Sequence, residues 1–290
     1  MSDKPRLSDW LQSLPQYALP HHLLSWGMWR LTRWRWPRFT QWAIRRYVAT
    51  YDVDLAEAEV ADVSAYPHVN SFFTRALRPG ARPVDADPQA VVSPVDGRVS
   101  QAGVVREGRL IQAKGRRFAL AELLADNDWA RRLQGGSYAT LYLSPRDYHR
   151  VHAPLDLRLL EMIHVPGRIF SVNESTTRTV PRLFARNERV VAFFDTPAGA
   201  LAVVWVGAIF VSSIETVWAG EVTPPRSRRI RRWRYQDREI RYEKGMEIGR
   251  FNMGSTVILV SEAGRIRWDQ GLAPGRRVLV GRQIGSIVDG

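Results

Sequence analysis

Residues 196–214 read TPAGALAVVWVGAIFVSSI, which is 19 positions without one charged side chain. The run is long enough to cross a membrane as a helix, since a spanning helix needs about 20 apolar residues. Pro197 and Gly199 at its start, and Gly207 between two runs rich in β-branched side chains, argue against a helix. We therefore predict a buried β-hairpin, with one strand on each side of Gly207.

The chain beyond about residue 90 has a similar texture. Short alternating or β-branched segments recur, separated by Gly, Pro, Asp and Asn. One helix is expected in this region, over residues 118–133. The pattern favours a mainly β (α+β) fold, with a β-sandwich-like body behind an N-terminal helical segment. Strands are predicted over residues 90–92, 98–105, 110–113, 138–143, 156–164, 190–194, 201–206, 209–214, 231–235 and 256–260.

The composition excludes several kinds of protein. With 290 residues, of which 45% are hydrophobic and 24% charged, the chain is neither disordered nor fibrous. It contains no cysteine, so disulfide scaffolds, zinc fingers, iron–sulfur clusters and thiol catalysis are excluded. A nucleophile in this protein has to be Ser, Thr, Lys or a carboxylate.

The net charge of +13 indicates an anionic partner, such as an acidic membrane surface, nucleic acid or an acidic substrate. Two short segments carry most of this charge. Residues 1–50 contain eight basic and two acidic side chains. Residues 226–241 contain eight arginines against Asp237 and Glu239, so each segment contributes +6.

The N-terminal segment has the composition of a membrane-surface element. Six of the 11 tryptophans lie within the first 42 residues, among arginines, as is typical of the membrane–water interface. Residues 10–29 are uncharged, but Pro15 and Pro20 interrupt them, so no spanning helix is expected. After Pro37 an amphipathic helix is predicted, with Trp42 on its apolar stripe.

Two alternatives remain for this segment. It packs on the rest of the chain as a helical hairpin, or its arginines and aromatic side chains bind nucleic acid. We favour the membrane surface and expect no nucleic-acid partner. The predicted division is a membrane-associating helical segment over residues 1–65 and a catalytic domain over residues 66–290.

Three separated motifs carry side chains suited to catalysis. Asp96 lies in an Asp-Gly turn between two predicted strands, a pattern that usually marks only a hairpin. His149 and His152 follow a predicted strand and can both reach one site, where a neutral imidazole is the natural general base. Two structural histidines are the alternative. No third ligand has suitable spacing, so no metal site is predicted.

The third motif contains Ser255, which follows a glycine and enters an apolar predicted strand. The second glycine of the nucleophile elbow G-x-S-x-G is missing, so this motif alone is weak. Asp96, His152 and Ser255 nevertheless supply the residue types of a serine hydrolase triad, which is one alternative function. A noncatalytic basic module that binds membrane or nucleic acid is another.

Together and in this order, the motifs resemble those of the phosphatidylserine decarboxylases of the bacterial, membrane-associated type. The resemblance runs from about residue 66 to the end, and the N-terminal segment suits it. Met253 departs from the pattern, because many members have Leu there. The matching positions are 72–75, 77, 82–83, 94–97, 114–115, 120, 123–124, 145–152, 187–189, 206–208, 244–245, 247, 249, 251 and 254–256.

The resemblance implies a proenzyme that cleaves itself between Gly254 and Ser255. The implied products are a β chain of residues 1–254 and an α chain of residues 255–290. Ser255 becomes a covalent pyruvoyl (pyruvate) cofactor, which forms a Schiff base with the substrate and accepts electrons in place of pyridoxal phosphate.

The resemblance also implies residue roles and partners. His152 activates Ser255, Asp96 orients His152, and His149 protonates the carbanion that decarboxylation leaves. The reaction converts phosphatidylserine to phosphatidylethanolamine and CO2, a step of phospholipid biosynthesis. We expect a peripheral protein on the cytoplasmic side of a bacterial cell membrane, facing anionic lipid, with a homodimer left open.

Overall fold

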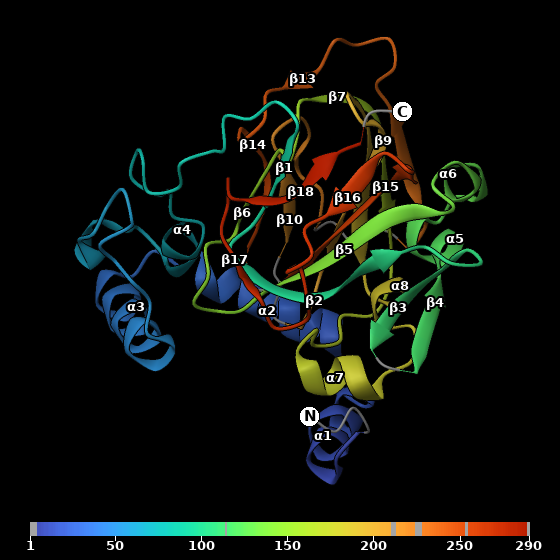
Figure 1. Cartoon of the computed structure of the whole chain (residues 1–290). Helices are drawn as coiled ribbons and strands as arrows, with labels where there is room; N and C mark the ends of the chain where they lie inside the picture. The colour runs from blue at the N-terminus through green and yellow to red at the C-terminus, as the bar shows by residue number, and fades with distance from the viewer. Residues whose placement is uncertain (1–4, 114, 210–212, 224–227, 253–254, 289–290) are drawn as a thin grey trace.

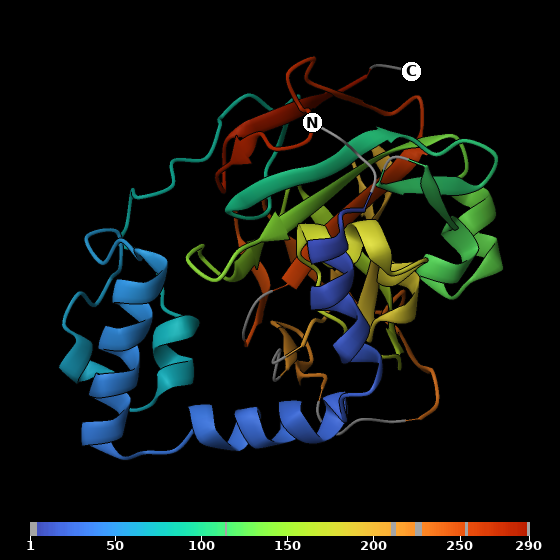
Figure 2. The ribbon, with the colours of Figure 1, turned by 90° about the horizontal axis from the view of Figure 1, so that it is seen from below.

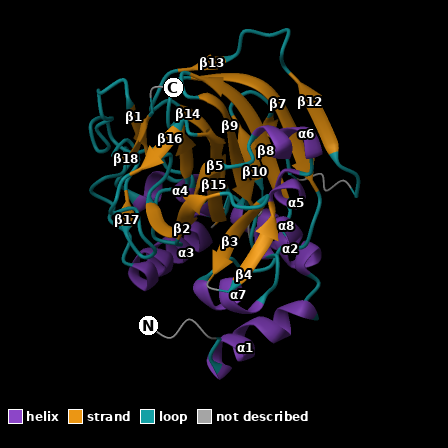
Figure 3. Cartoon of the chain, turned by 45° about the vertical axis from the view of Figure 1, so that its right-hand side comes forward, coloured by secondary structure: helices purple, strands orange, loops and turns teal. Residues whose placement is uncertain are grey.

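A large antiparallel sheet forms the centre of the computed structural model, which describes residues 5–113, 115–209, 213–223, 228–252 and 255–288 (Figures 1 and 3). Its central strands are buried because their sequences are runs of Val, Ala, Leu, Ile and Phe. The predicted mainly β body is confirmed. The order is β12 (Arg231–Arg234), β7 (Leu157–Val165), β8 (Arg189–Thr196), β9 (Gly199–Val206), β15 (Ser255–Ala263), β5 (Gly136–Leu143), β2 (Gly97–Val104) and β17 (Arg277–Val278), and β13 (Arg241–Tyr242) also pairs with β7.

The uncharged stretch forms one central strand, and the predicted hairpin about Gly207 is wrong. β9 lies between β8 and β15, and the β8–β9 turn ends at Gly199, whose φ is +77°. At Gly207 the chain leaves the sheet, and Ile214 begins β10 (Ile214–Thr216) in another sheet. The prediction failed because β8 and β15, which are equally apolar, occupy both edges of β9. Residues 210–212 of the predicted second strand lie outside the described residues.

Smaller sheets accompany the large one. The other predicted strands are confirmed to within three residues at each end. The strands that were not predicted lie mostly in the smaller sheets, and most of them are too short for a periodic pattern to reveal them. One small sheet has the order β11 (Gly220–Glu221), β10, β14 (Glu247–Phe251) and β6 (Arg150–His152). Another consists of β1 (Ala90–Val92), β18 (Gln283–Ile287) and β16 (Ile266–Trp268), and β3 (Arg109–Ala113) pairs with β4 (Arg116–Ala119).

The helix predicted over residues 118–133 is wrong as a single element. Its first two residues belong to β4, and α5 (Leu120–Leu124) and α6 (Asn127–Arg132) follow as two short helices. They are separated at Ala125, whose φ of 54° ends α5. Asp126 then begins α6 by accepting a hydrogen bond from the Trp129 amide (2.8 Å). The apolar pattern continues through residues 118–133, so it did not reveal that Asp126 caps a second helix.

Helices dominate the N-terminal part of the chain, as predicted. Figure 2 shows α2 along one edge of the β body, α3 to one side of it and α1 in front of it. No helix in the described part of the chain is long and apolar enough to cross a membrane. The helices are α1 (Leu7–Ser13), η1 (Leu14–Tyr17), α2 (His21–Thr32), α3 (Pro37–Tyr51), η2 (Val63–Ala65) and α4 (Val69–Phe73), and the body adds α7 (Glu174–Thr179) and α8 (Leu183–Arg186).

The N-terminal helices pack on the body through specific contacts. Asp9 of α1 is buried and pairs with Arg178 of α7 (Oδ1 to Nη2, 3.0 Å). Ile44 of α3 is buried in a small cluster with Phe72 of α4. Trp42, on the predicted apolar stripe, is 64% exposed, and Ile44 makes the packing contact with α4.

Candidate active site

Ser255 is the first residue of β15, where the chain enters the centre of the large sheet. It lies opposite Leu143, the last residue of β5. Its side chain is buried, and its hydroxyl has no hydrogen-bond partner among the described residues. Such atoms are rare, because desolvation then costs free energy that no bond offsets. Gly254, on the other side of the expected cleavage, lies outside the described residues.

Two connections between the large and a small sheet have their ends close together at this point. One connects β5 to β6 and contains His149, and the other connects β14 to β15 and ends at Ser255. The pairing of Leu143 with Ser255 holds them at one end. At the other end the amide of Phe251 donates to the carbonyl of His149 (3.0 Å). The topology therefore brings the histidine motif to the serine motif.

His149 lies in a closed site. Its side chain is fully buried, and its ring packs on Phe73 of α4 with 4.1 Å between ring centroids. Nδ1 lies 2.7 Å from the carbonyl of Asp147, so Nδ1 carries the proton, and Nε2 has no partner in the described structure. Burial lowers the pKa of His149 from 6.5 to about 3. The imidazole is therefore neutral near pH 7, and it can donate from Nε2 only after gaining a proton there.

His152, on β6, has both ring nitrogens engaged. Nδ1 lies 2.8 Å from the carbonyl of Gly245, and Nε2 lies 3.1 Å from the hydroxyl of Tyr148. Because a carbonyl only accepts, Nδ1 carries the proton and Nε2 accepts from Tyr148. Burial lowers the pKa of His152. The amide of His152 donates to the carbonyl of Pro94 (2.8 Å), which places the first motif beside the second.

Asp96 is buried, but its carboxylate binds Arg82. Nε of Arg82 lies 3.0 Å from each carboxylate oxygen, and the amide of Val280 donates to Oδ1 (2.8 Å). Among the described residues, no hydrogen bond joins Asp96 to His152 or His152 to Ser255. The Gly245 carbonyl, the charge of Glu247 and, to a smaller extent, the charge of Asp96 raise the pKa of His152 against the larger effect of burial. The three motifs thus share one region without a formed triad.

The described residues also contain no group of three His, Asp or Glu side chains that could hold a metal ion.

Comparison with known proteins identifies the relatives of the chain. A family model described as phosphatidylserine decarboxylase matches residues 69–286. The chain belongs to this family. A second model, described as PSD, matches residues 11–52.

Relatives within the phosphatidylserine decarboxylase family match almost the whole chain. The phosphatidylserine decarboxylase proenzyme of Azotobacter vinelandii is 52% identical over 284 residues, which cover 97% of this chain and 99% of the relative. The proenzyme of Methylococcus capsulatus is 53% identical over 272 residues, covering 93% and 94%. The proenzyme of Bordetella avium is 54% identical over 264 residues, covering 90% of each chain.

Some groups that shape the site of this decarboxylase family member were not assigned a role from the sequence. The hydroxyl of Tyr47 on α3 donates to the carbonyl of Pro145 (2.6 Å), at the start of the segment that leads to His149. Tyr148 and Arg82 lie within matching positions, but only the structure reveals their bonds to His152 and Asp96. Tyr47 is 98 residues from its partner, so no local pattern could reveal that contact.

Proposed function

We propose that this protein cleaves itself between Gly254 and Ser255, converts Ser255 to a pyruvoyl group, and decarboxylates phosphatidylserine to phosphatidylethanolamine. One observation carries the proposal. Ser255 is a buried serine without a hydrogen-bond partner in the described structure, at the start of a central strand and beside the segment that holds His149. The names of the relatives support phosphatidylserine as the substrate.

The cleavage needs only water as a co-reactant. Oγ of Ser255 attacks the carbonyl carbon of Gly254, the hydroxyl proton passes to a base, and the C–N bond breaks, so that the amide becomes an ester. Loss of the Cα proton of Ser255 then expels the Gly254 carboxylate and leaves a dehydroalanine. Tautomerisation and addition of water release ammonia, and a pyruvoyl group remains on the chain of residues 255–290.

Nε2 of His152 is the base that we assign to the first proton transfer. It is the unprotonated ring nitrogen, and burial keeps the imidazole neutral near pH 7. The Gly245 carbonyl fixes its tautomer, as the aspartate does in a serine hydrolase. The Tyr148 hydroxyl either turns away from Nε2 or passes the proton to it. The charge of Asp96 stabilises the imidazolium that forms.

His149 is suited to the second reaction. A pyruvoyl group supplies the electron sink that decarboxylation of an α-amino acid headgroup requires. The free Nε2 of His149 fits the task of carrying a proton to the reacting carbon. A substrate carboxylate beside this imidazole favours its protonated form, because an opposite charge raises the pKa that burial lowers. Phe73 covers one face of the ring and limits the access of water.

The N-terminal segment is suited to the bilayer that holds the substrate. Exposed aromatic side chains beside arginines are typical of a membrane interface, and Arg30 lies over the ring of Trp26. We infer peripheral binding to an anionic membrane. In the second basic segment Arg232 already pairs with Asp126 and Glu161, so we assign docking to the first. The exposed tryptophans of the N-terminal segment, with the exposed fraction of each, are Trp26 (50%), Trp34 (53%), Trp36 (49%) and Trp42 (64%).

Intact-mass analysis of the purified protein tests the proposal. The wild-type protein should consist of two chains divided after Gly254, and the smaller should resist Edman degradation because a pyruvoyl terminus has no amine. Ser255→Ala should remain one chain. A wild-type chain that stays intact while it decarboxylates phosphatidylserine would contradict the proposal. An intact chain that forms a fluorophosphonate adduct would support a serine hydrolase instead.

A further inference from the structure

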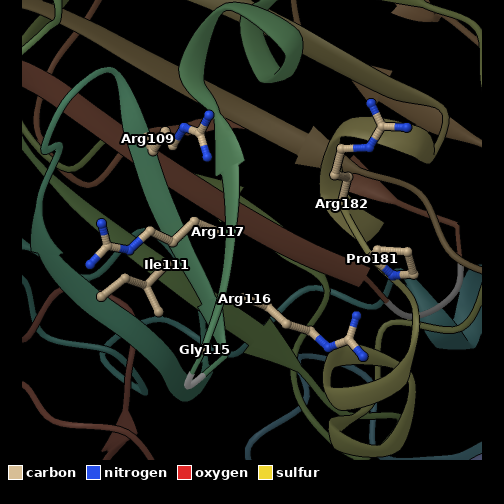
Figure 4. Close-up of a pocket in the computed structure, with 7 residues that line it drawn as sticks. All are labelled: Arg109, Ile111, Gly115, Arg116, Arg117, Pro181 and Arg182. Carbon is tan, nitrogen blue, oxygen red and sulfur yellow. The ribbon is translucent and has the colours of Figure 1, made fainter.

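A cavity of about 530 Å³ lies on the far side of the β3–β4 hairpin from the strands of the large sheet, and arginines dominate its walls. Figure 4 shows that the lining residues come from the hairpin and from the segment between α7 and α8; Arg116 points toward that segment, whereas Ile111 and Arg117 point to its other side. Neither Ser255 nor the two histidines of the site line it. The lining residues are Arg109, Ile111, Gly115, Arg116, Arg117, Pro181 and Arg182.

Most of this positive charge is uncompensated. Arg182 pairs with Glu122 (3.0 Å), but Arg109, Arg116 and Arg117 have no ion pair among the described residues. Arg232, by contrast, pairs with two carboxylates. Like charges that share one cavity repel each other unless an anion lies between them. The arrangement therefore favours an anionic ligand.

A buried side chain fixes the two walls relative to each other. Gln112 is 1% exposed, and its Nε2 donates to the carbonyls of Thr177 and Val180, both at 2.8 Å. Its Oε1 accepts from the amide of Leu183 (2.7 Å). Leu110 on the same hairpin face is also buried. The cavity is thus held open by packed elements, which reduces the entropy lost when a ligand binds.

The cavity lies at the end of the molecule that carries α1. α1 packs on α7 through Asp9, which binds Arg178 and also accepts from the Ser175 hydroxyl (2.8 Å). Figures 1 and 3 show α1, α7 and the β3–β4 hairpin at this same end. Leu7 and Leu11 of α1 are 76% and 66% exposed. Apolar side chains and uncompensated arginines at one end match the acyl and phosphate layers of an anionic bilayer.

We propose that this cavity binds the phosphate of an anionic phospholipid headgroup, as a site separate from the one around Ser255. The proposal rests on the membrane association proposed above. Guanidinium groups bind phosphate oxygens in pairs, which gives geometric selectivity as well as charge. Ile111 and Pro181 add apolar wall to the cavity, which fits a phosphate that carries a glycerol ester better than free inorganic phosphate.

The test compares two variants of equal charge by co-sedimentation with phosphatidylglycerol–phosphatidylcholine vesicles, which contain no substrate. The cavity variant carries Arg109→Gln, Arg116→Gln and Arg117→Gln. The control carries three exposed arginines changed in the same way, away from the hairpin: Arg265→Gln, Arg267→Gln and Arg276→Gln. The cavity variant should bind about 100-fold more weakly than wild type at low salt, and the control less than about threefold, because a basic residue contributes only near the lipid surface.

Competition distinguishes the sources of phosphate. Dihexanoylphosphatidylglycerol should displace the wild-type protein from the vesicles at concentrations where inorganic phosphate does not. Equal losses in the two variants would overturn the site, since net charge would then explain the binding. Equal competition by inorganic phosphate would overturn the lipid assignment. If the triple variant does not fold, Arg116→Gln should still weaken binding about fivefold relative to Arg267→Gln. Failure of the decarboxylase proposal would appear separately, as an uncleaved wild-type chain.

Discussion

The two histidines of the site differ in what binds their Nε2 atoms. Nε2 of His152 accepts from Tyr148, whereas Nε2 of His149 has no partner among the described residues. Nε2 of His152, which is bonded to a hydroxyl, is placed to exchange a proton with an oxygen atom. Nε2 of His149, which has no partner, leaves room for a reacting carbon atom. This difference supports the assignment of the two residues to separate reactions.

Substitution should separate the two reactions. His152→Ala should remain largely uncleaved, because Ser255 loses its base. His149→Asn should still be cleaved, since the Asn amide can replace Nδ1–H as donor to Asp147, but its decarboxylation rate should fall about 10²–10⁴-fold. Denaturing gels measure cleavage, and CO2 release measures decarboxylation. An uncleaved His149→Asn beside a normally cleaved His152→Ala would mean that the two roles are exchanged.

The buried His149 should also make stability depend on pH. Its pKa is lowered from 6.5 to about 3 in the folded protein. Below pH 6.5 the unfolded chain therefore takes up a proton that the folded chain refuses until about pH 3, so stability falls as the pH falls. Between pH 7 and pH 5 the wild type should lose about 2 kcal/mol more free energy of unfolding than His149→Asn. Urea titrations at both pH values measure this, and equal losses would show that His149 is not buried as neutral imidazole.

At the scale of elements, one hydrogen bond connects α3, which belongs to the proposed membrane-docking segment, to the segment that leads to His149. Tyr47→Phe removes the donor to the carbonyl of Pro145, which is half-buried, so it should cost about 1 kcal/mol of unfolding free energy. Tyr51→Phe is the matched control, four residues further along α3 and 40% exposed, and should change less than about 0.5 kcal/mol. Urea unfolding compares the two. A similar effect of both substitutions would indicate that the Tyr47 bond does not hold the segment.

The sequence predicts elements where local pattern decides and fails where distant partners decide. The strands at 138–143 and 201–206 were found because alternation and β-branching continue for several residues. The hairpin about Gly207 was wrong because strand pairing depends on segments up to 60 residues away. The same difference between local pattern and distant partners applies to the candidate site. Motif order located His149 and Ser255, whereas the Arg82 bond to Asp96 needed the folded chain.

At the scale of the whole molecule, the N-terminal segment both exposes apolar side chains to solvent and packs on the body. Asp9 and Tyr47 attach it to the body, while several of its large apolar side chains face water. Deletion of residues 1–50 would therefore remove contacts of the site together with the docking surface. Substitution of exposed side chains alone is the sharper test of membrane binding.

A variant with Trp26→Ser, Trp34→Ser, Trp36→Ser and Trp42→Ser should bind anionic vesicles more weakly than wild type at low salt. Its fold should persist, because none of the four side chains is buried. A control changes exposed apolar side chains elsewhere: Val104→Ser, Val217→Ser and Met246→Ser. High salt should weaken wild-type binding only in part, since it screens the arginines but not tryptophan burial. The tryptophan variant should lose its remaining binding in the same salt. The test is co-sedimentation at low and high salt. A variant that sediments like wild type in high salt would place the apolar contact outside residues 21–51.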